Sequence, residues 1–261
     1  LSLSKAARIE AAEWADIALG FENGDGNPAT VNVARRSSSG WILEVKGNAA
    51  HSSQIFKPEV GAGAIYEASR ILNQFYEALS AEEYLTFNPG MILGGTDVTY
   101  NEQSKSGTAF GKSNVVAQTA IVTGDIRCLS MEQLKRTQET MKKIVGEHLP
   151  QTQATITFEE GYPPFAPTEG NYALMKAFSQ VSQDLGFGEV SSVNPADAGA
   201  ADISFTAGLV KMGIDAMGMS GANDHTVNET GKVNALPMQT KRAAVLLYRL
   251  FKDKALSPEK K

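Results

Sequence analysis

The alternation of strand and helix patterns between residues 41 and 161 constrains the fold of this chain most strongly. Residues 41–47 have the sequence Trp-Ile-Leu-Glu-Val-Lys-Gly, which is typical of a strand, and apolar residues between Gly61 and Leu79 recur at helical spacing. The predicted elements follow one another as strand 41–47, helix 61–79, strands 86–93 and 114–129, helix 130–149 and strand 152–158. This β-α-β-β-α-β order predicts a ferredoxin-like sandwich, with two helices on one face of a four-stranded antiparallel sheet.

The two segments that flank this sandwich predict a second domain of α/β type. A strand is predicted at 14–22, and a Pro-rich connector at 161–167 leads out of the sandwich. The later elements are predicted as helix 169–185, short strands at 188–193 and 214–219, and helix 237–252. Residues 1–35 and 162–261 are therefore interpreted as two pieces of one domain, which residues 36–161 interrupt.

Composition excludes several classes of partner. The net charge of −5 argues against nucleic acid, because phosphate binding requires a concentrated basic surface. Arg35 and Arg36 lie beside a Ser-rich turn and are predicted to form a solvated corner. No apolar run approaches the roughly 18 residues of a membrane span.

The single cysteine, Cys128, excludes an internal disulfide framework and is predicted to be a small core residue.

Two residues are candidate metal ligands. His225 lies in a loop at 218–229 that contains glycines, with Glu229 four residues later, and neutral imidazole is a common zinc ligand. Glu22 follows an apolar run, at the carboxyl end of a predicted strand, where sites in open α/β sheets are usually found. The structural alternatives are a surface loop histidine and a turn acid that accepts backbone hydrogen bonds.

Three further residues are candidates for contacts with a substrate. His51, which follows the small residues at 47–50, is either an ordinary loop residue or a donor to a developing oxyanion. Arg127 could clamp a carboxylate with its guanidinium group, together with Asn114 at the start of the predicted strand, or it could pair with Asp125. A fourth residue, Asp202, is predicted to be structural, because it ends a tight turn as a helix N-cap.

Taken in order, these residues and motifs resemble the co-catalytic zinc metallopeptidases, which include glutamate carboxypeptidases, aminoacylases and the succinyl-diaminopimelate desuccinylase. The resemblance implies a catalytic α/β domain that carries two zinc ions, and a ferredoxin-like insert that acts as lid and dimerisation domain. By position, Glu22 would ligate one zinc ion and His225 the other. His51 would reach the active site of the partner subunit, and Asn114 and Arg127 would hold the terminal carboxylate of the substrate. Asp202 would support the site.

The chain also departs from that family. The family's His-x-Asp pair, bridging aspartate and Glu-Glu pair have no counterpart before His51. We therefore expect the chain to be the C-terminal part of a longer enzyme, and to bind zinc poorly and hydrolyse nothing by itself, since catalytic zinc usually has three protein ligands.

The predicted function of the whole enzyme is zinc-dependent hydrolysis of amide bonds next to a free carboxylate, of the carboxypeptidase or N-acyl-amino-acid amidohydrolase type. Its substrate would be a small peptide or an N-acyl amino acid, and a homodimer is expected to form through the lid. The alternative is a non-catalytic dimerisation or small-ligand-binding module. The sequence does not decide between a cytoplasmic and a periplasmic location.

Overall fold

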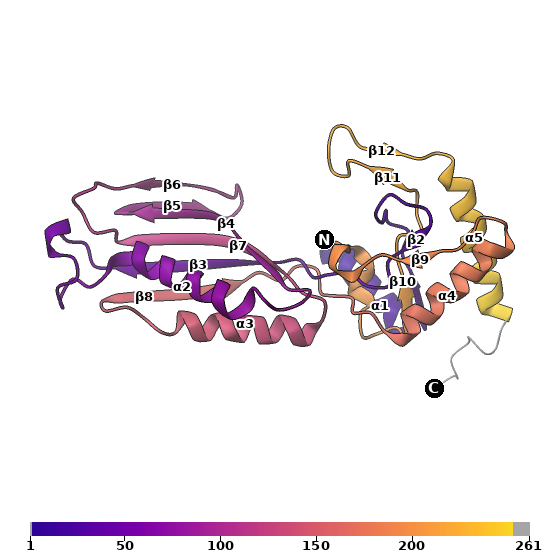
Figure 1. The fold of residues 1–261 in the computed structure, drawn as a ribbon, viewed down its shortest axis with the longest axis horizontal. Helices are drawn as coiled ribbons and strands as arrows, with labels where there is room; N and C mark the ends of the chain where they lie inside the picture. Colours follow the sequence, from indigo (N-terminus) through magenta and orange to yellow (C-terminus); the bar gives the residue numbers. More distant parts are fainter. Residues whose placement is uncertain (1, 253–261) are drawn as a thin grey trace. The chain divides into compact units, whose positions relative to one another are not determined.

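The computed structural model describes residues 2–252, which fold into two compact units (Figure 1). The first unit combines the chain up to Ser37 with the chain from Tyr162 onward, and the second comprises Ser38–Gly161. The chain thus forms a mixed α/β fold in which one unit is inserted into another. No helix among residues 2–252 is long and apolar enough to cross a membrane.

The second unit contains one four-stranded antiparallel sheet. Its elements are β3 (Ser39–Gly47), the 3-10 helix η1 (Ser52–Gln54), α2 (Gly63–Leu79), β4 (Thr86–Gly95), β7 (Thr119–Arg127), α3 (Met131–Val145) and β8 (Thr152–Phe158). The strands lie in the order β4-β7-β3-β8, so β4 and β8 form the two edges. The order of helices and strands along the chain is the predicted β-α-β-β-α-β order, with one additional hairpin.

The core of this unit lies between the sheet and its two helices, which cover the same face of the sheet (Figure 1). Alternate residues of β3 point toward that face, because successive side chains of a strand point to opposite sides. Trp41 and Leu43 of β3 pack with Phe75 of α2 and Met141 of α3, and all four are almost fully buried. Cys128 belongs to this cluster, as predicted.

The additional hairpin consists of β5 (Asp97–Asn101) and β6 (Ser106–Phe110), in a region predicted as a polar loop. Its side chains are largely exposed: β5 alternates polar and apolar residues over only five positions, and every residue of β6 is exposed. The predicted strand at 114–129 consequently begins later, at Thr119. Asn114 lies in a turn that precedes β7 and does not open the strand, which corrects the prediction.

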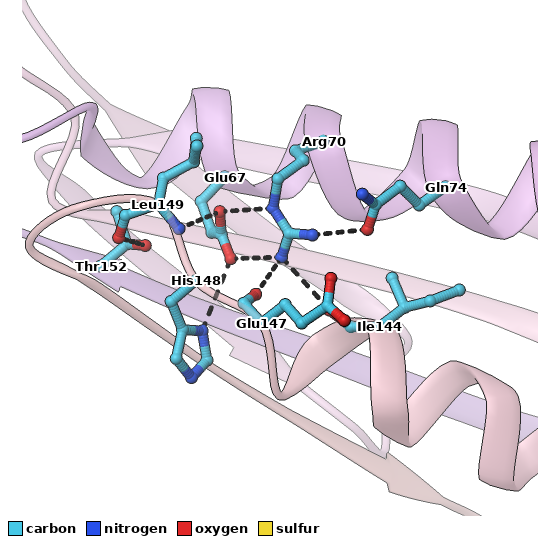
Figure 2. A network of polar contacts seen from close by, with 8 residues as sticks. All are labelled: Glu67, Arg70, Gln74, Ile144, Glu147, His148, Leu149 and Thr152. Atoms are coloured by element: carbon cyan, nitrogen blue, oxygen red, sulfur yellow. Dashed lines mark hydrogen bonds and ion pairs between the residues drawn. The ribbon is translucent and has the colours of Figure 1, made fainter.

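A buried polar network joins α2 to the end of α3 (Figure 2). The Glu67 side chain is fully buried and accepts hydrogen bonds from Arg70 at 2.9 Å and 2.7 Å, and from the Leu149 N–H at 3.1 Å. Arg70 also donates to the carbonyl oxygens of Ile144 and Glu147. Ile144 lies in the last turn of α3 and Glu147 lies two residues beyond its end, so Arg70 caps the C-terminus of that helix.

The first unit is built from short strands and three longer helices. Its elements are α1 (Ser2–Trp14), β1 (Ile17–Leu19), β2 (Thr30–Val31), α4 (Glu169–Asp184), β9 (Ser191–Ser192), η2 (Pro195–Asp197), η3 (Asp202–Thr206), β10 (Met212–Ile214), β11 (Gly221–Ala222), β12 (Thr230–Gly231) and α5 (Ala235–Lys252). Strands β1 and β10 pair in parallel, β2 and β9 pair in parallel, and β11 and β12 form an antiparallel pair. Phe178 of α4, Ile214 of β10 and Leu246 of α5 lie in its core.

Helix α1 was not predicted, and the strand predicted at 14–22 is confined to Ile17–Leu19. Ala12 is the single deeply buried residue among those of α1 whose exposure is described. The helix therefore lacks the wide apolar stripe by which amphipathic helices are recognised.

Candidate functional site

Glu22 lies in the loop that follows β1, three residues beyond its last residue, Leu19. Its side chain is exposed, so the expectation of a carboxylate that ends a buried strand is wrong. The backbone N–H of Glu22 donates to Oδ1 of Asp215 at 3.3 Å, and Gly218 N–H donates to the Glu22 carbonyl at 3.3 Å. The loop is therefore attached to the segment that follows β10, while the Glu22 carboxylate faces solvent.

A buried ion pair lies beneath this loop. Arg35 is 5 % exposed and Asp215 is 0 % exposed, and Arg35 donates to Oδ2 of Asp215 through Nε at 3.0 Å. Arg35 Nη2 also donates to the Asn23 carbonyl at 3.1 Å. The prediction of a solvated corner is therefore wrong for Arg35, because its partner is 180 positions away in the sequence. A charge buried in this way requires a partner, and the pair fixes the backbone at Glu22 and Asn23.

His225 lies in the loop between β11 and β12, with its side chain exposed. Its φ of 62° falls in the left-handed region, which non-glycine residues adopt rarely. The His225 N–H donates to Oε2 of Glu229 at 3.2 Å. Glu229, the acid four residues after His225, therefore has a structural role in this loop, as the acceptor for the His225 backbone.

Side-chain hydrogen bonds join the Glu22 loop to the His225 loop. Asn23 Nδ2 donates to both carboxylate oxygens of Asp224, at 3.0 Å and 2.9 Å, and Asn23 Oδ1 accepts from Gly221 N–H at 3.3 Å. Lys232 Nζ adds a bond to the Gly26 carbonyl at 2.9 Å. Glu22 directly precedes Asn23 in the sequence, and His225 directly follows Asp224. The Asn23–Asp224 contact thus brings together the two loops that carry the predicted metal ligands, although the loops are about two hundred positions apart.

The donor types at these loops, one carboxylate and one imidazole, are those that zinc accepts. Within residues 2–252, however, no group of three or more histidine, cysteine, aspartate and glutamate side chains is placed to hold a metal ion. Since catalytic zinc usually has three protein ligands, the described residues fit part of a metal site and do not complete one.

A cavity of about 450 Å³ adjoins Glu22 and is lined on one side by apolar residues of α1 and β1. Asp202 and Asp215 line it together with Arg8, which forms an ion pair with Asp202. The Tyr162 hydroxyl donates to Asp202 at 3.3 Å, and burial together with the charge of Asp202 raises the pKa of Tyr162. Asp202 therefore lines the cavity and is bonded to both Arg8 and Tyr162. It is not the predicted N-cap, because it is the first residue of η3 itself.

His51 lies in the second unit, just before η1, and its side chain is exposed. Its Nδ1 accepts a hydrogen bond from Ser53 N–H at 3.3 Å and contacts Ser53 Oγ at 2.8 Å. A backbone N–H can only donate, so the neutral ring carries its proton on Nε2. His51 consequently presents an N–H donor, as a residue that polarises a carbonyl must.

Asn114 lies beside His51, whereas Arg127 does not. The Ser52 N–H donates to the Asn114 carbonyl at 2.9 Å, and His51 forms a bridge with Val115. Arg127 ends β7, and eight residue steps of about 3.3 Å separate it by about 26 Å from the Thr119 end near Asn114. One small substrate cannot contact both Asn114 and Arg127 of a single chain.

Arg127 donates through Nε to Oδ2 of Asp125 at 3.0 Å, as the structural alternative anticipated. Both side chains are about one third exposed, so the pair lies at the surface of the unit.

Comparison with known proteins bears directly on the second unit. Residues 33–153 match the family M20_dimer, described as a peptidase dimerisation domain. The structure of the Bacillus subtilis YxeP protein, a dinuclear metal binding peptidase from the M20 family, has a TM-score of 0.64 at 16% identity, and the match covers 95% of this chain and 60% of that one. The family match identifies an M20 peptidase dimerisation domain within residues 33–153, and the structural likeness, at 16% identity, shows the fold. Neither match singles out the glutamate carboxypeptidases or the desuccinylase.

Two other proteins resemble this chain, one in structure and one in sequence. Aminopeptidase PepT from Bacillus cereus has a TM-score of 0.68 at 17% identity, covering 95% of this chain and 62% of that one. The N-acetyldiaminopimelate deacetylase of Halalkalibacterium halodurans is 24% identical over 161 residues, which are 59% of this chain and 38% of the deacetylase. The chain therefore spans less than two thirds of the length of each of these relatives.

Proposed function

We propose that this chain is part of a metal-dependent amide hydrolase that cleaves the bond next to a free carboxylate. The observation that carries the proposal is the bonding of the Glu22 loop to the His225 loop through Asn23 and Asp224. The likeness to M20 peptidases and to a deacetylase supports the same reaction class. A carboxypeptidase and an N-acyl-amino-acid amidohydrolase both fit this description.

Two zinc ions are the proposed cofactors, with Glu22 a ligand of one and His225 a ligand of the other. When bound, such ions supply an activated water at neutral pH. The chain's own residues bind and orient the substrate. We expect this chain by itself to bind zinc weakly and to be inactive, because its described residues provide fewer than three ligands in any one group.

The second unit is proposed to act as a ferredoxin-like lid that contributes to two active sites of a homodimer. His51 and Asn114 of one protomer would act at the site of the other, where Nε2–H of His51 donates to the carbonyl oxygen as it becomes negative. Arg127 would bind the substrate carboxylate at the site of its own protomer. The separation of about 26 Å along β7 supports this division between protomers.

The edge strand β4 is the proposed place of dimerisation. Ile92 on this strand is 53% exposed, and Ile65 and Tyr76 of the neighbouring α2 are 46% and 66% exposed. Because β4 is an edge strand of the four-stranded sheet, exposed apolar side chains on it and on the neighbouring helix favour pairing with a second copy. Ile92→Glu is expected to shift the protein from dimer to monomer in sedimentation, whereas Thr155→Glu on the opposite edge strand β8 should not. A dimer that persists in the Ile92 variant at micromolar concentration would contradict this surface.

The reaction itself is tested with the whole protein, N-acyl amino acids and dipeptides. We expect hydrolysis that falls at least about 100-fold after treatment with a chelator and returns with zinc, since the water must be activated by the metal. Hydrolysis that is unchanged by the chelator would refute the proposal. A stable dimer that hydrolyses none of these compounds would favour the alternative, a non-catalytic dimerisation module.

A further inference from the structure

We infer that Asn23 is a positioning residue that holds the Glu22 loop and the His225 loop together. The inference rests on the proposed function, since it concerns the two proposed metal ligands. Neither Asn23 nor Asp224 has the role of a ligand in that proposal. Their contribution would be to fix where the ligands lie.

The orientation of the Asn23 amide is determined by its partners. A carboxylate only accepts hydrogen bonds and a backbone N–H only donates, so Nδ2 must face Asp224 and Oδ1 must face Gly221. Asn23 therefore uses both ends of its side chain on the β11–β12 segment. An aspartate or an alanine at this position could not form the same set of bonds.

The backbone of Asn23 is fixed by a buried ion pair. Its carbonyl accepts from Nη2 of Arg35, whose guanidinium group is paired with the buried Asp215. Asp215 also accepts from the backbone N–H of Glu22. The ion pair thus fixes the backbone on one side of the contact, and Asn23 transmits that position to Asp224.

The His225 loop, on the Asp224 side of the contact, has a strained backbone that the contact stabilises. Asn223 and His225 both have positive φ values, 61° and 62°, which cost free energy unless neighbouring contacts maintain them. Asp224 lies between them and faces Asn23 with its carboxylate. Loss of the Asn23 contact would therefore leave the His225 loop held by its own internal hydrogen bonds and by Lys232.

The test is an exchange of the two side chains, read by amide hydrogen exchange of the metal-free 261-residue chain. Asn23→Asp places two carboxylates face to face, and the double variant Asn23→Asp with Asp224→Asn restores one donor and one acceptor. We expect exchange at Gly221, His225 and Thr226 to accelerate about tenfold in the single variant and to return toward wild type in the double variant. The matched control is Asn27→Ala, in the same loop, because the Asn27 side chain accepts from Ala29 N–H within that loop.

The outcome decides the inference in either direction. Equal exchange in wild type and Asn23→Asp, or a double variant as fast as the single one, would overturn it. Zinc titration of the whole protein, followed by the imidazole signals of His225, then separates an effect on ligand position from an effect on loop stability. Asn23→Ala should weaken the zinc response of the whole protein several-fold and Asn27→Ala should not. An unchanged response in a loosened loop would also overturn the inference. A whole wild-type protein in which zinc leaves His225 unaffected would count against the proposed function alone, because exchange has already decided the contact.

Discussion

Replacing Arg70 with alanine is expected to lower the free energy of unfolding of the second unit by about 3–5 kcal/mol, because the buried Glu67 carboxylate loses its permanently charged partner and is left with Leu149 N–H and the His148 ring. The Glu67 carboxylate is fully buried and accepts two hydrogen bonds from Arg70. The variant also removes donors from the carbonyls of Ile144 and Glu147 at the end of α3 (Figure 2). Urea unfolding followed by circular dichroism measures the change.

Arg136 provides the matched control for this prediction. It pairs with Glu82, but its side chain is 55% exposed, and exposed pairs contribute at most about 1 kcal/mol. Arg136→Ala should therefore have a much smaller effect than Arg70→Ala. Equal effects of the two substitutions would show that the buried network does not stabilise this unit.

The pH dependence of the free energy of unfolding, compared between wild type and Arg70→Ala, gives an independent check. Burial raises the pKa of Glu67, but the hydrogen bonds from Arg70 and from Leu149 N–H, with the charge of Arg70, outweigh burial and lower the pKa overall. A lowered pKa means that this stabilisation is present above the pKa of the unfolded chain and is lost as the pH falls through the folded value. The difference between wild type and Arg70→Ala should therefore shrink in acid. A difference that grows in acid would contradict this assignment.

The second large effect is expected at His51. His51→Ala in the whole protein should lower kcat by about 10²–10³-fold, because a single oxyanion donor contributes that much in other hydrolases. Its Nδ1 already accepts from Ser53 N–H, so the donor that is lost is Nε2–H. The measurement is the hydrolysis of an N-acyl amino acid at saturating substrate. Serine at position 53 supplies the control: Ser53→Ala keeps the backbone N–H and should retain most of the activity.

The sequence was sufficient for the layered sandwich of the second unit, because its strands and helices carry strong apolar periodicity. It missed the β5–β6 hairpin, because β5 alternates polar and apolar residues over only five positions and every residue of β6 is exposed. The start of α3 is likewise marked by near neighbours, because the Ser130 side chain accepts from Gln133 N–H at 3.1 Å as an N-cap serine does. Local patterns such as these arise between near neighbours and can be recognised in a sequence.

The contacts that hold the candidate site together could not be predicted from local sequence patterns. Asn23 and Asp224 are 201 positions apart, and Arg35 and Asp215 are 180 apart. Arg35 was misjudged because a charged residue beside a Ser-rich turn is usually solvated, and its buried partner lies beyond any local pattern. A partial signal existed at Asp215, a lone acid directly after an apolar strand. The pairing itself depends on how β1, β10 and the segment that carries Arg35 come together.

The division of the active site between protomers is the central claim, and mixing two inactive variants tests it most directly. His51→Ala and Arg127→Ala homodimers should each retain less than about 1% of wild-type activity, since each lacks a charged or donor contact at both sites. If the two residues act at one site from different protomers, a mixed dimer contains one intact site. Equal mixing with subunit exchange should then restore about one quarter of the wild-type activity, because half of the dimers are mixed. Activity that stays at the level of the single variants, with mixed dimers verified by mass spectrometry, would contradict the account.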